Sequence, residues 1–375
     1  MKINTFQVER WLNLYEDKAK FELAETDAKP FTIEELSQLN PQENLLQKLA
    51  KIKIGYNPTK GSKSLRKKIA NLYGNNTSEE NILVTTGAIE ADFLLANVLL
   101  EKGDKVIALW PAYQALYSTA ESCGAKLEFW KLSPENNFQP DIEELAKIID
   151  EKTKLVVLNI PNNPTGAIIN ESQLKTILKW SEEYDFYVLC DEVYHELITD
   201  NNIVPPYGHS LSKKAISVGS MSKAYGLSGI RLGWIAGSET IIDQCWQLKD
   251  YTSISNSPIS DYLAQFALDN FKKIFERNSN ILKSNREVIS LWFTEHQKYF
   301  DFYLPDAGVL CFPKIKNLPI SSEELALDLF HKKSLLVVPG ECFGFPNFLR
   351  IGFGGDTAKL KKSLSVFSSY LKEFF

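Results

Sequence analysis

The middle of the chain alternates short, continuously apolar segments with segments of helical pattern. Leu155–Ile160 (LVVLNI) and Phe186–Cys190 (FYVLC) are too short for helices and rich in residues that favour strands. Strands that are apolar at nearly every position are buried on both faces of a sheet, and helices between them allow parallel connections. The sequence therefore predicts an α/β fold with a mostly parallel central sheet flanked by helices. The predicted strands are Asn81–Thr86, Lys105–Trp110, Leu155–Ile160, Phe186–Cys190, Ala215–Gly219 and Arg231–Ala236, and the clearest helices are Ala88–Leu100 and Glu171–Tyr184.

The two ends of the chain have a different pattern. Residues up to about 45 form helix and loop, with Trp11 and Leu12 on an apolar stripe, and from about residue 283 onward helices and short strands mix. A chain of 375 residues also exceeds one typical domain. We therefore expect a large domain at residues 46–282 and a smaller α/β domain built from residues 1–45 and 283–375.

Composition excludes several classes of function. The 42 Lys and Arg residues stand against 47 Asp and Glu, so the basic excess typical of nucleic-acid binding is missing. The apolar runs are too short to span a bilayer, and the polar N-terminus lacks a signal pattern. Five widely spaced cysteines without a CxxC pair indicate reduced thiols, with neither a disulfide framework nor a metal site. We expect a cytoplasmic protein without nucleic-acid or membrane partners.

Residues with chemical potential gather where the predicted strands end, which is where open α/β sheets bind ligands. Thr86–Ile89 (TGAI) joins a predicted strand to a predicted helix. Its glycine lets the backbone approach a ligand, and the free N–H groups at the helix start favour an anion. Taken alone, such a segment is more often an ordinary strand-to-helix turn.

Lys223 follows another apolar strand, in the sequence Ser220-Met221-Ser222-Lys223. Burying an unpaired ammonium group is costly, whereas an imine with an aldehyde removes that charge or shares it. Ser220 and Arg231 are suited to bind a phosphate, with the arginine offering a bidentate fork. The alternative is an exposed lysine near a glycine-rich turn.

Three further strand ends carry polar or aromatic residues. Asp191 ends a buried strand, with Tyr194 three residues later, and needs a cationic or hydrogen-bonding partner. A helix cap or a structural ion pair is the alternative. Asn159–Gly166 (NIPNNPTG) forms a rigid turn that can hold an asparagine side chain at a fixed angle, or serves only as a turn. Tyr113 is placed to stack on a flat ring, although an aromatic residue there is more often core.

Together these residues resemble the class I/II aminotransferases of fold type I, the aspartate aminotransferase-like enzymes that depend on pyridoxal 5'-phosphate (PLP). Order and approximate spacing agree over about residues 50 to 355. The matching motifs are Thr86-Gly87-Ala88, Pro111-x-Tyr113, Asn162-Asn163-Pro164-Thr165-Gly166, Asp191-x-x-Tyr194, Ser220-x-Ser222-Lys223 with Arg231, and Phe348-Leu349-Arg350.

The resemblance implies a role for each position around the cofactor ring. Lys223 forms the Schiff base with PLP and later shuttles the proton, and Asp191 pairs with the pyridine nitrogen. Asn163 and Tyr194 hydrogen-bond the phenolic oxygen, while Tyr113 stacks on the ring. Lys223, Asp191 and Tyr194 are the predicted catalytic residues.

The resemblance also implies phosphate and substrate contacts. Arg350 binds the substrate α-carboxylate, with Asn163 beside it. Tyr56 is similar to the tyrosine that reaches the phosphate of the partner subunit, which implies a homodimer with shared active sites. The predicted phosphate-binding and neighbouring cofactor residues are Thr86, Gly87, Ala88, Ile89, Ser220, Ser222 and Arg231.

The chain departs from the family pattern near Glu22–Pro30 (ELAETDAKP), where relatives often carry a glycine-rich lid. Glu25 in this segment is a candidate substrate-binding residue that favours a basic side chain, and a solvent-exposed carboxylate is the alternative. Aspartate-specific relatives of one subgroup place a second arginine near Lys249–Pro258. This stretch contains no arginine, so the resemblance disfavours a dicarboxylic substrate.

We expect transamination between an α-amino acid and a 2-oxo acid. The alternative within the same chemistry is a carbon–sulfur β-lyase or a cyclase similar to capreomycidine synthase, and the core motifs do not separate these outcomes. A regulatory protein that retains the fold is disfavoured, because Lys223 and Asp191 are intact and no basic helix-turn-helix pattern is present.

Overall fold

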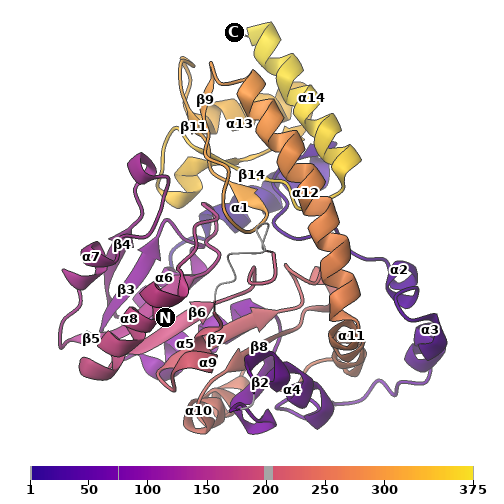
Figure 1. Ribbon diagram of the computed structural model, residues 1–375, viewed down its shortest axis with the longest axis vertical. Helices are drawn as coiled ribbons and strands as arrows, with labels where there is room; N and C mark the ends of the chain where they lie inside the picture. Colours follow the sequence, from indigo (N-terminus) through magenta and orange to yellow (C-terminus); the bar gives the residue numbers. More distant parts are fainter. Residues whose placement is uncertain (1, 75, 198–205, 375) are drawn as a thin grey trace.

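One large sheet occupies the middle of the molecule (Figure 1). The computed structural model describes residues 2–74, 76–197 and 206–374. The strands of the sheet in this part of the chain are β2 (Ile82–Thr85), β3 (Lys105–Trp110), β4 (Lys126–Lys131), β5 (Thr153–Asn159), β6 (Tyr187–Asp191), β7 (Ala215–Ser220) and β8 (Gly233–Ala236). Their order is β2-β8-β7-β6-β5-β3-β4, and β8 runs in the opposite direction to the other strands named here. The predicted α/β fold with a mostly parallel sheet is confirmed.

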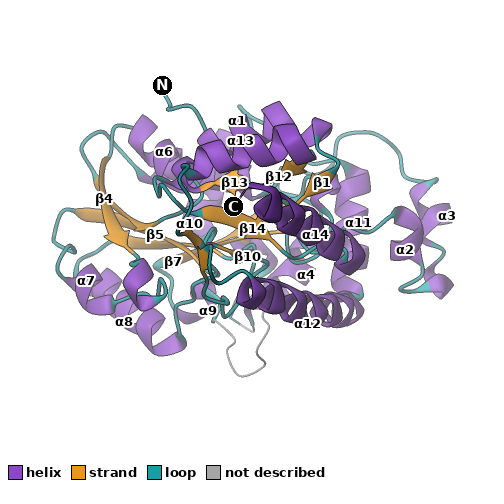
Figure 2. Cartoon of the chain, turned by 90° about the horizontal axis from the view of Figure 1, so that it is seen from above, coloured by secondary structure: helices purple, strands orange, loops and turns teal. Residues whose placement is uncertain are grey.

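Strand β5 shows why the central strands are apolar at nearly every position. The helices around the sheet are α4 (Lys63–Ala70), α5 (Ala88–Leu99), α6 (Ala115–Ser122), α7 (Ile142–Ala146), α8 (Glu171–Glu183), α9 (Gly208–Leu211) and α10 (Glu239–Lys249). Leu155 and Val157 pack in the core with α5, α6 and α10, while Val156 and Leu158 pack in the opposite core with α8. Figure 2 shows α6 and α8 on opposite sides of the sheet. Because successive side chains point to opposite faces, burial on both faces requires an unbroken apolar run.

The N-terminal segment is joined to the C-terminal part of the chain. Strand β1 (Phe21–Glu22) pairs in parallel with β12 (Leu335–Leu336). The indole N–H of Trp11, on α1 (Gln7–Tyr15), donates to the carbonyl oxygen of Val337 at 2.9 Å. The division into two domains with the boundaries given above stays a prediction. The remaining C-terminal elements are β9 (Phe300–Asp301), β10 (Leu310–Cys311), β11 (Lys314–Ile315), α13 (Ser322–Lys333), β13 (Val338–Pro339), β14 (Leu349–Gly352) and α14 (Thr357–Phe374).

A long helix, α12 (Phe271–Glu295), connects the large sheet to these C-terminal elements (Figure 1). Its buried residues recur at helical spacing, as in Asn278, Leu282, Asn285 and Ile289. Such spacing gives one buried face and one solvent face. No helix within the described ranges is both long and apolar enough to cross a membrane.

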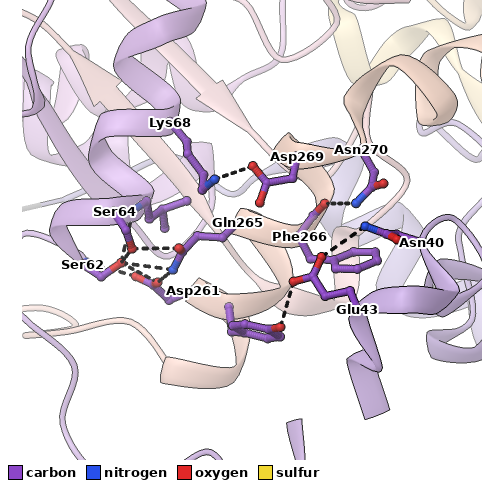
Figure 3. A network of polar contacts seen from close by, with 12 residues as sticks. Asn40, Glu43, Ser62, Ser64, Lys68, Asp261, Gln265, Phe266, Asp269 and Asn270 are labelled. Carbon is purple, nitrogen blue, oxygen red and sulfur yellow. Dashed lines mark hydrogen bonds and ion pairs between the residues drawn. The ribbon is translucent and has the colours of Figure 1, made fainter. Parts of the chain in front are cut away.

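A polar network fastens α11 (Pro258–Asp269) to α4 and to the segment before it (Figure 3). The buried carboxylate of Asp261 accepts hydrogen bonds from the Ser62 hydroxyl at 2.7 Å, the Gln265 amide at 2.7 Å and the Asn57 amide at 2.8 Å. Further out, α2 (Ile33–Ser37) and α3 (Leu45–Leu49) stand apart from the sheet (Figure 1). The hydrogen bonds to Asp261 fix the chain next to Tyr56, which is 89% exposed.

Candidate active site

A cavity of about 430 Å³ lies at the carboxyl ends of β5, β6 and β7. The strand ends of a parallel sheet share one edge, so the turns that follow them face a common space. We call the cavity residues at the strand ends and just beyond them the inner wall: Asn163, Asp191, Ser220 and Lys223. Phe6, Glu9, Leu12 and Thr26 of the N-terminal segment form the outer wall. The remaining described residues that line the cavity are Val8, Ala88, Ile89, Asp92, Tyr113, Asn159, Val193, Tyr194, Ser222, Ser228, Arg231 and Arg350.

Most residues predicted from the sequence line this cavity, and four do not. Thr86 lies behind it, with its backbone N–H bonded to the Glu90 carboxylate at 2.5 Å. Gly87 packs against Arg231, and a Cβ atom there would lie 2.7 Å from Nη2 of that arginine. Tyr56 is at the surface, and Glu25 lines a second cavity. Those that line the first cavity are Ala88, Ile89, Tyr113, Asn163, Asp191, Tyr194, Ser220, Ser222, Lys223, Arg231 and Arg350.

Lys223 brings its amine into the cavity just beyond β7. Its Nζ donates a hydrogen bond to the hydroxyl of Thr26 at 2.5 Å. Burial lowers the pKa of Lys223, against the opposing effect of Asp27 and with a further lowering by Arg350. A lysine with a lowered pKa is more often neutral at physiological pH, as a nucleophile or general base must be.

Asp191 ends β6 and is 4% exposed. Its Oδ1 accepts a hydrogen bond from the backbone N–H of Val193 at 3.2 Å. Burial raises the pKa of Asp191 to about 7, although the Val193 amide and the charge of Lys223 act in the opposite direction. A carboxylate in this position gains from a cationic partner placed beside it.

The start of α5 and the segment after β7 form a cradle for an anion. Gly87 precedes α5 with φ +76°, and no side chain caps the first N–H groups of that helix. Nη1 of Arg231 lies 3.5 Å from the Ser222 hydroxyl, and the Ser222 N–H donates to the Ser220 hydroxyl at 3.0 Å. Free N–H groups at a helix start together with a guanidinium group suit a phosphate.

The turn after β5 positions Asn163. Its backbone N–H donates to the Asn159 side chain at 2.6 Å. The Asn162 amide donates to the carbonyl oxygen of Pro111 at 3.1 Å, which ties this turn to the one after β3. Asn163 is 5% exposed, so its side chain is held in a defined place at the cavity edge.

Arg350 reaches the cavity from β14 and is 1% exposed. Its guanidinium donates to the Asn163 side chain at 3.4 Å and to the carbonyl oxygen of Ala24 at 3.1 Å. Nε of Arg350 has no hydrogen-bond partner among the described residues. A buried guanidinium with an unused donor is suited to bind a carboxylate.

The outer wall and Asp92 were missed by the sequence reasoning. The Tyr113 hydroxyl donates to the Glu9 carboxylate at 2.7 Å, and the Tyr113 ring lies 4.8 Å from that of Phe6 between centroids. The apolar stripe around Trp11 predicts packing, but nothing in it points toward the cavity. The sequence did contain a signal for Asp92, because this residue is a carboxylate inside the apolar helix α5.

The second cavity lies between β1 and α14 and is lined by Glu22, Glu25 and Lys359 among others. Burial, with the charge of Glu25, raises the pKa of Glu22 to about 7. The structure therefore does not bring Glu25 to Lys223, and its substrate-binding role stays a prediction. No group of three His, Cys, Asp or Glu side chains that could hold a metal ion occurs within the described ranges.

Fold and site together define a PLP-dependent enzyme of fold type I. The family model for aminotransferase class I and II matches residues 21–367, so the chain belongs to that family. The family expected from the sequence motifs is confirmed, and with it the enzyme class and the cofactor.

Three known proteins illustrate the similarity. Capreomycidine synthase of Streptomyces vinaceus is 28% identical over 364 residues, 97% of this chain and 93% of the relative. An aspartate aminotransferase of Pyrococcus horikoshii is 30% identical over 327 residues, 83% of this chain and 81% of the relative. The crystal structure of a PLP-dependent aminotransferase from Streptococcus suis 89-1591 matches with a TM-score of 0.94 and 34% identity, covering 100% of this chain and 99% of that one.

The residues of the cavity fit PLP. The uncapped start of α5 with Arg231 suits its phosphate, and Asp191 offers a buried carboxylate for a protonated ring nitrogen. Lys223 supplies an amine that burial inclines toward the neutral form. When bound, PLP provides an electron sink that eases bond cleavage at the α-carbon of an amino acid.

Proposed function

We propose that the protein is an aminotransferase that moves the amino group of an α-amino acid to a 2-oxo acid through a Schiff base of Lys223. The observation that carries the proposal is the convergence of Lys223, Asp191 and Arg350 on one cavity. An amine, a buried carboxylate and a buried guanidinium at its walls correspond to the three tasks of proton transfer, ring-nitrogen pairing and substrate carboxylate binding.

Each of these side chains contributes by its own chemistry. Lys223 accepts the α-proton of the substrate and returns it, as a general base and then a general acid. Arg350 holds the α-carboxylate and thereby fixes which bond of the α-carbon is aligned for cleavage. Asn163 and Tyr194 bind the phenolic oxygen of the ring, and Tyr113 stacks on its face.

The charge of the outer wall supports a substrate with a neutral or basic side chain. Glu9 lines the cavity, and its negative charge acts on both Lys223 and Arg350. The arginines that line the cavity in the described ranges are Arg231 and Arg350, which the proposal assigns to the phosphate and the α-carboxylate. A second carboxylate on the substrate would be repelled by Glu9, and the described cavity lining would offer it no further arginine as a partner.

A lyase or cyclase activity is the second candidate. It is supported by the similarity to capreomycidine synthase, which extends over 97% of the chain. The inner-wall residues do not separate these outcomes.

We further propose that the protein is a cytoplasmic homodimer whose two subunits share their active sites. Ile54 and Tyr56 are 86% and 89% exposed on a segment that the Asp261 network holds in place. Large apolar side chains presented on a fixed segment are suited to burial against a second copy. Light scattering of the purified protein is expected to give twice the chain mass of 42.6 kDa.

Product analysis separates transamination from elimination. The PLP-loaded protein is incubated with single amino acids, first alone and then with a 2-oxo acid. Aminotransferase activity yields a 2-oxo acid product together with pyridoxamine phosphate, whereas elimination yields ammonia and pyruvate. Release of ammonia without pyridoxamine phosphate, for every amino acid that reacts, would refute the aminotransferase assignment.

A further inference from the structure

Asp92 is a buried carboxyl group that the roles described so far leave unused. It lies on α5, one helical turn after Ala88, and its side chain lines the cavity. The residue is 4% exposed, and its Oδ1 has no hydrogen-bond partner in the described part of the chain. A buried carboxyl without a partner is costly when charged, so a specific reason for its presence is expected.

The charge that Asp92 faces is that of Asp191. Both side chains line the same cavity, both are 4% exposed, and the interaction between their charges is repulsive. Burial, followed by the charge of Asp191, raises the pKa of Asp92 well above its ordinary value. Two carboxyls that share one dry site do not both ionise near neutral pH, so one of them keeps a proton.

The groups around this pair decide which carboxyl keeps the proton. Asp191 accepts a hydrogen bond from the Val193 amide and interacts with the positive charge of Lys223. Asp92 interacts with no comparable cation, and the only charge that acts on it in the described residues is that of Asp191. The negative charge is therefore better stabilised on Asp191 and the proton on Asp92.

We propose that Asp92 is a positioning residue: a neutral acid that holds one proton beside Asp191, so that the pair presents a single negative charge to the ring nitrogen of PLP. This inference rests on the ring-nitrogen role proposed for Asp191. The neutral Asp92 avoids a second buried charge and offers its O–H to Asp191. It touches neither the reacting carbon nor the substrate carboxylate, and acts through Asp191.

The proposal predicts a specific pH dependence in Asp92→Asn. A carboxyl whose pKa is raised on folding stabilises the fold fully below its unfolded value near 4, and that contribution is lost as pH rises through the folded pKa. For the full-length protein after cofactor removal, urea unfolding is therefore expected to show that the part of the stability due to Asp92 falls from pH 4 to pH 8. In Asp92→Asn, which keeps a neutral hydrogen-bond donor that cannot ionise, the fall is expected to be shallower.

Glu90→Gln is the matched control on the same helix. Glu90 is also buried, at 9% exposure, but it is hydrogen-bonded by Thr252 and by the backbone N–H of Thr86. Although burial raises the pKa of Glu90, these bonds outweigh burial and lower it. Its contribution is already complete above the unfolded pKa of 4.5, so Glu90→Gln is expected to leave the fall between pH 5 and pH 8 unchanged, whereas Asp92→Asn flattens it.

Cofactor retention provides the second measurement. PLP release from the holoenzyme is followed by its visible absorbance after dilution. Asp92→Asn is expected to release PLP at nearly the wild-type rate, and Asp92→Leu about tenfold faster, the effect of losing one hydrogen bond to a charged group. An unfolding profile of Asp92→Asn parallel to the wild type from pH 4 to pH 8 would overturn the shared proton. Wild-type retention in Asp92→Leu would overturn the positioning role.

A failure of the underlying assignment would look different. If Asp191→Ala also retained PLP like the wild type, the ring-nitrogen role of Asp191 would fall, whatever the Asp92 variants do. If Asp191→Ala released PLP and Asp92→Leu did not, the role of Asp191 would stand and that of Asp92 would be rejected.

Discussion

The inner and outer walls of the cavity come from different parts of the chain. The inner wall follows buried strands of one sheet, so the positions of Asp191 and Lys223 are fixed by the core. The outer wall comes from residues 6–26, which are joined to the C-terminal part of the chain through β1 and β12. The comparison teaches that the sheet places Asp191 and Lys223, while a segment distant in the sequence closes the other side of the cavity and contacts Lys223 through Thr26.

The largest effect is expected at the inner wall, in Lys223→Ala. Loss of the proton-transferring amine should reduce turnover by about a thousandfold or more, the upper range for general acid–base catalysis. PLP should still bind without a covalent link, which absorbance spectra and a binding titration would detect. Lys213→Ala, at an exposed position, is the control. Full activity in Lys223→Ala would remove the basis of the proposed function.

Asp191→Ala is expected to have the next largest effect, on cofactor affinity as well as on rate. Removing one partner of a buried charge pair costs about 3 kcal/mol, or roughly a hundredfold in PLP affinity. Fluorescence titration with PLP measures this change. Asp17→Ala, an exposed carboxylate of the N-terminal segment, should leave the affinity unchanged. An unchanged rate in Asp191→Ala would exclude the ring-nitrogen role.

Glu9→Gln tests the outer wall, because glutamine removes the charge of Glu9 and keeps an acceptor for the Tyr113 hydroxyl. We expect kcat/KM for an amino acid with a basic side chain to fall by about tenfold, the effect of one charge-assisted hydrogen bond, and kcat/KM for an acidic one to rise. PLP affinity should not change, which separates this variant from Asp191→Ala. Glu16→Gln, exposed on the same segment, is the control. A loss of PLP affinity in Glu9→Gln as large as that in Asp191→Ala would contradict the division into two walls.

The smallest effect is expected in Glu22→Gln, at the second cavity. Because burial raises the pKa of Glu22 from 4.5 to about 7, its contribution to stability is lost as pH rises across that interval. The variant should therefore be more stable than the wild type at pH 8 and not at pH 4, by urea unfolding. Glu34→Gln, at an exposed position, should change neither value. A large loss of activity would place the second cavity within the reaction centre.

The sequence was informative wherever a local pattern determines the structure. An unbroken apolar run predicts a strand buried on both faces, and the residue after it lies at the ligand-binding edge, which located Asp191 and Lys223. Strand β4, in contrast, lies at the sheet edge and has mostly half-buried and exposed residues, so its pattern (KLEFWK) did not predict a strand. Nor did local pattern reveal that β8 runs antiparallel.

The missed site residues depend on contacts distant in the sequence. Thr26 meets Lys223 across 197 positions, and Glu9 meets Tyr113 across 104. No local periodicity encodes such a meeting, because it arises only when β1 pairs with β12 and carries the N-terminal segment over the sheet. The placement of Glu25 away from Lys223 has the same origin.

The alternation of β5 between two cores limits how this protein can change its length. Deleting or inserting one residue between Leu155 and Asn159 would exchange the faces of the side chains beyond the change, and so turn Asn159 away from the turn it supports. Length changes among homologues are therefore expected in the surface connections, such as those on either side of α7. The strands that end at the cavity should keep a constant count of residues throughout the evolution of the lineage.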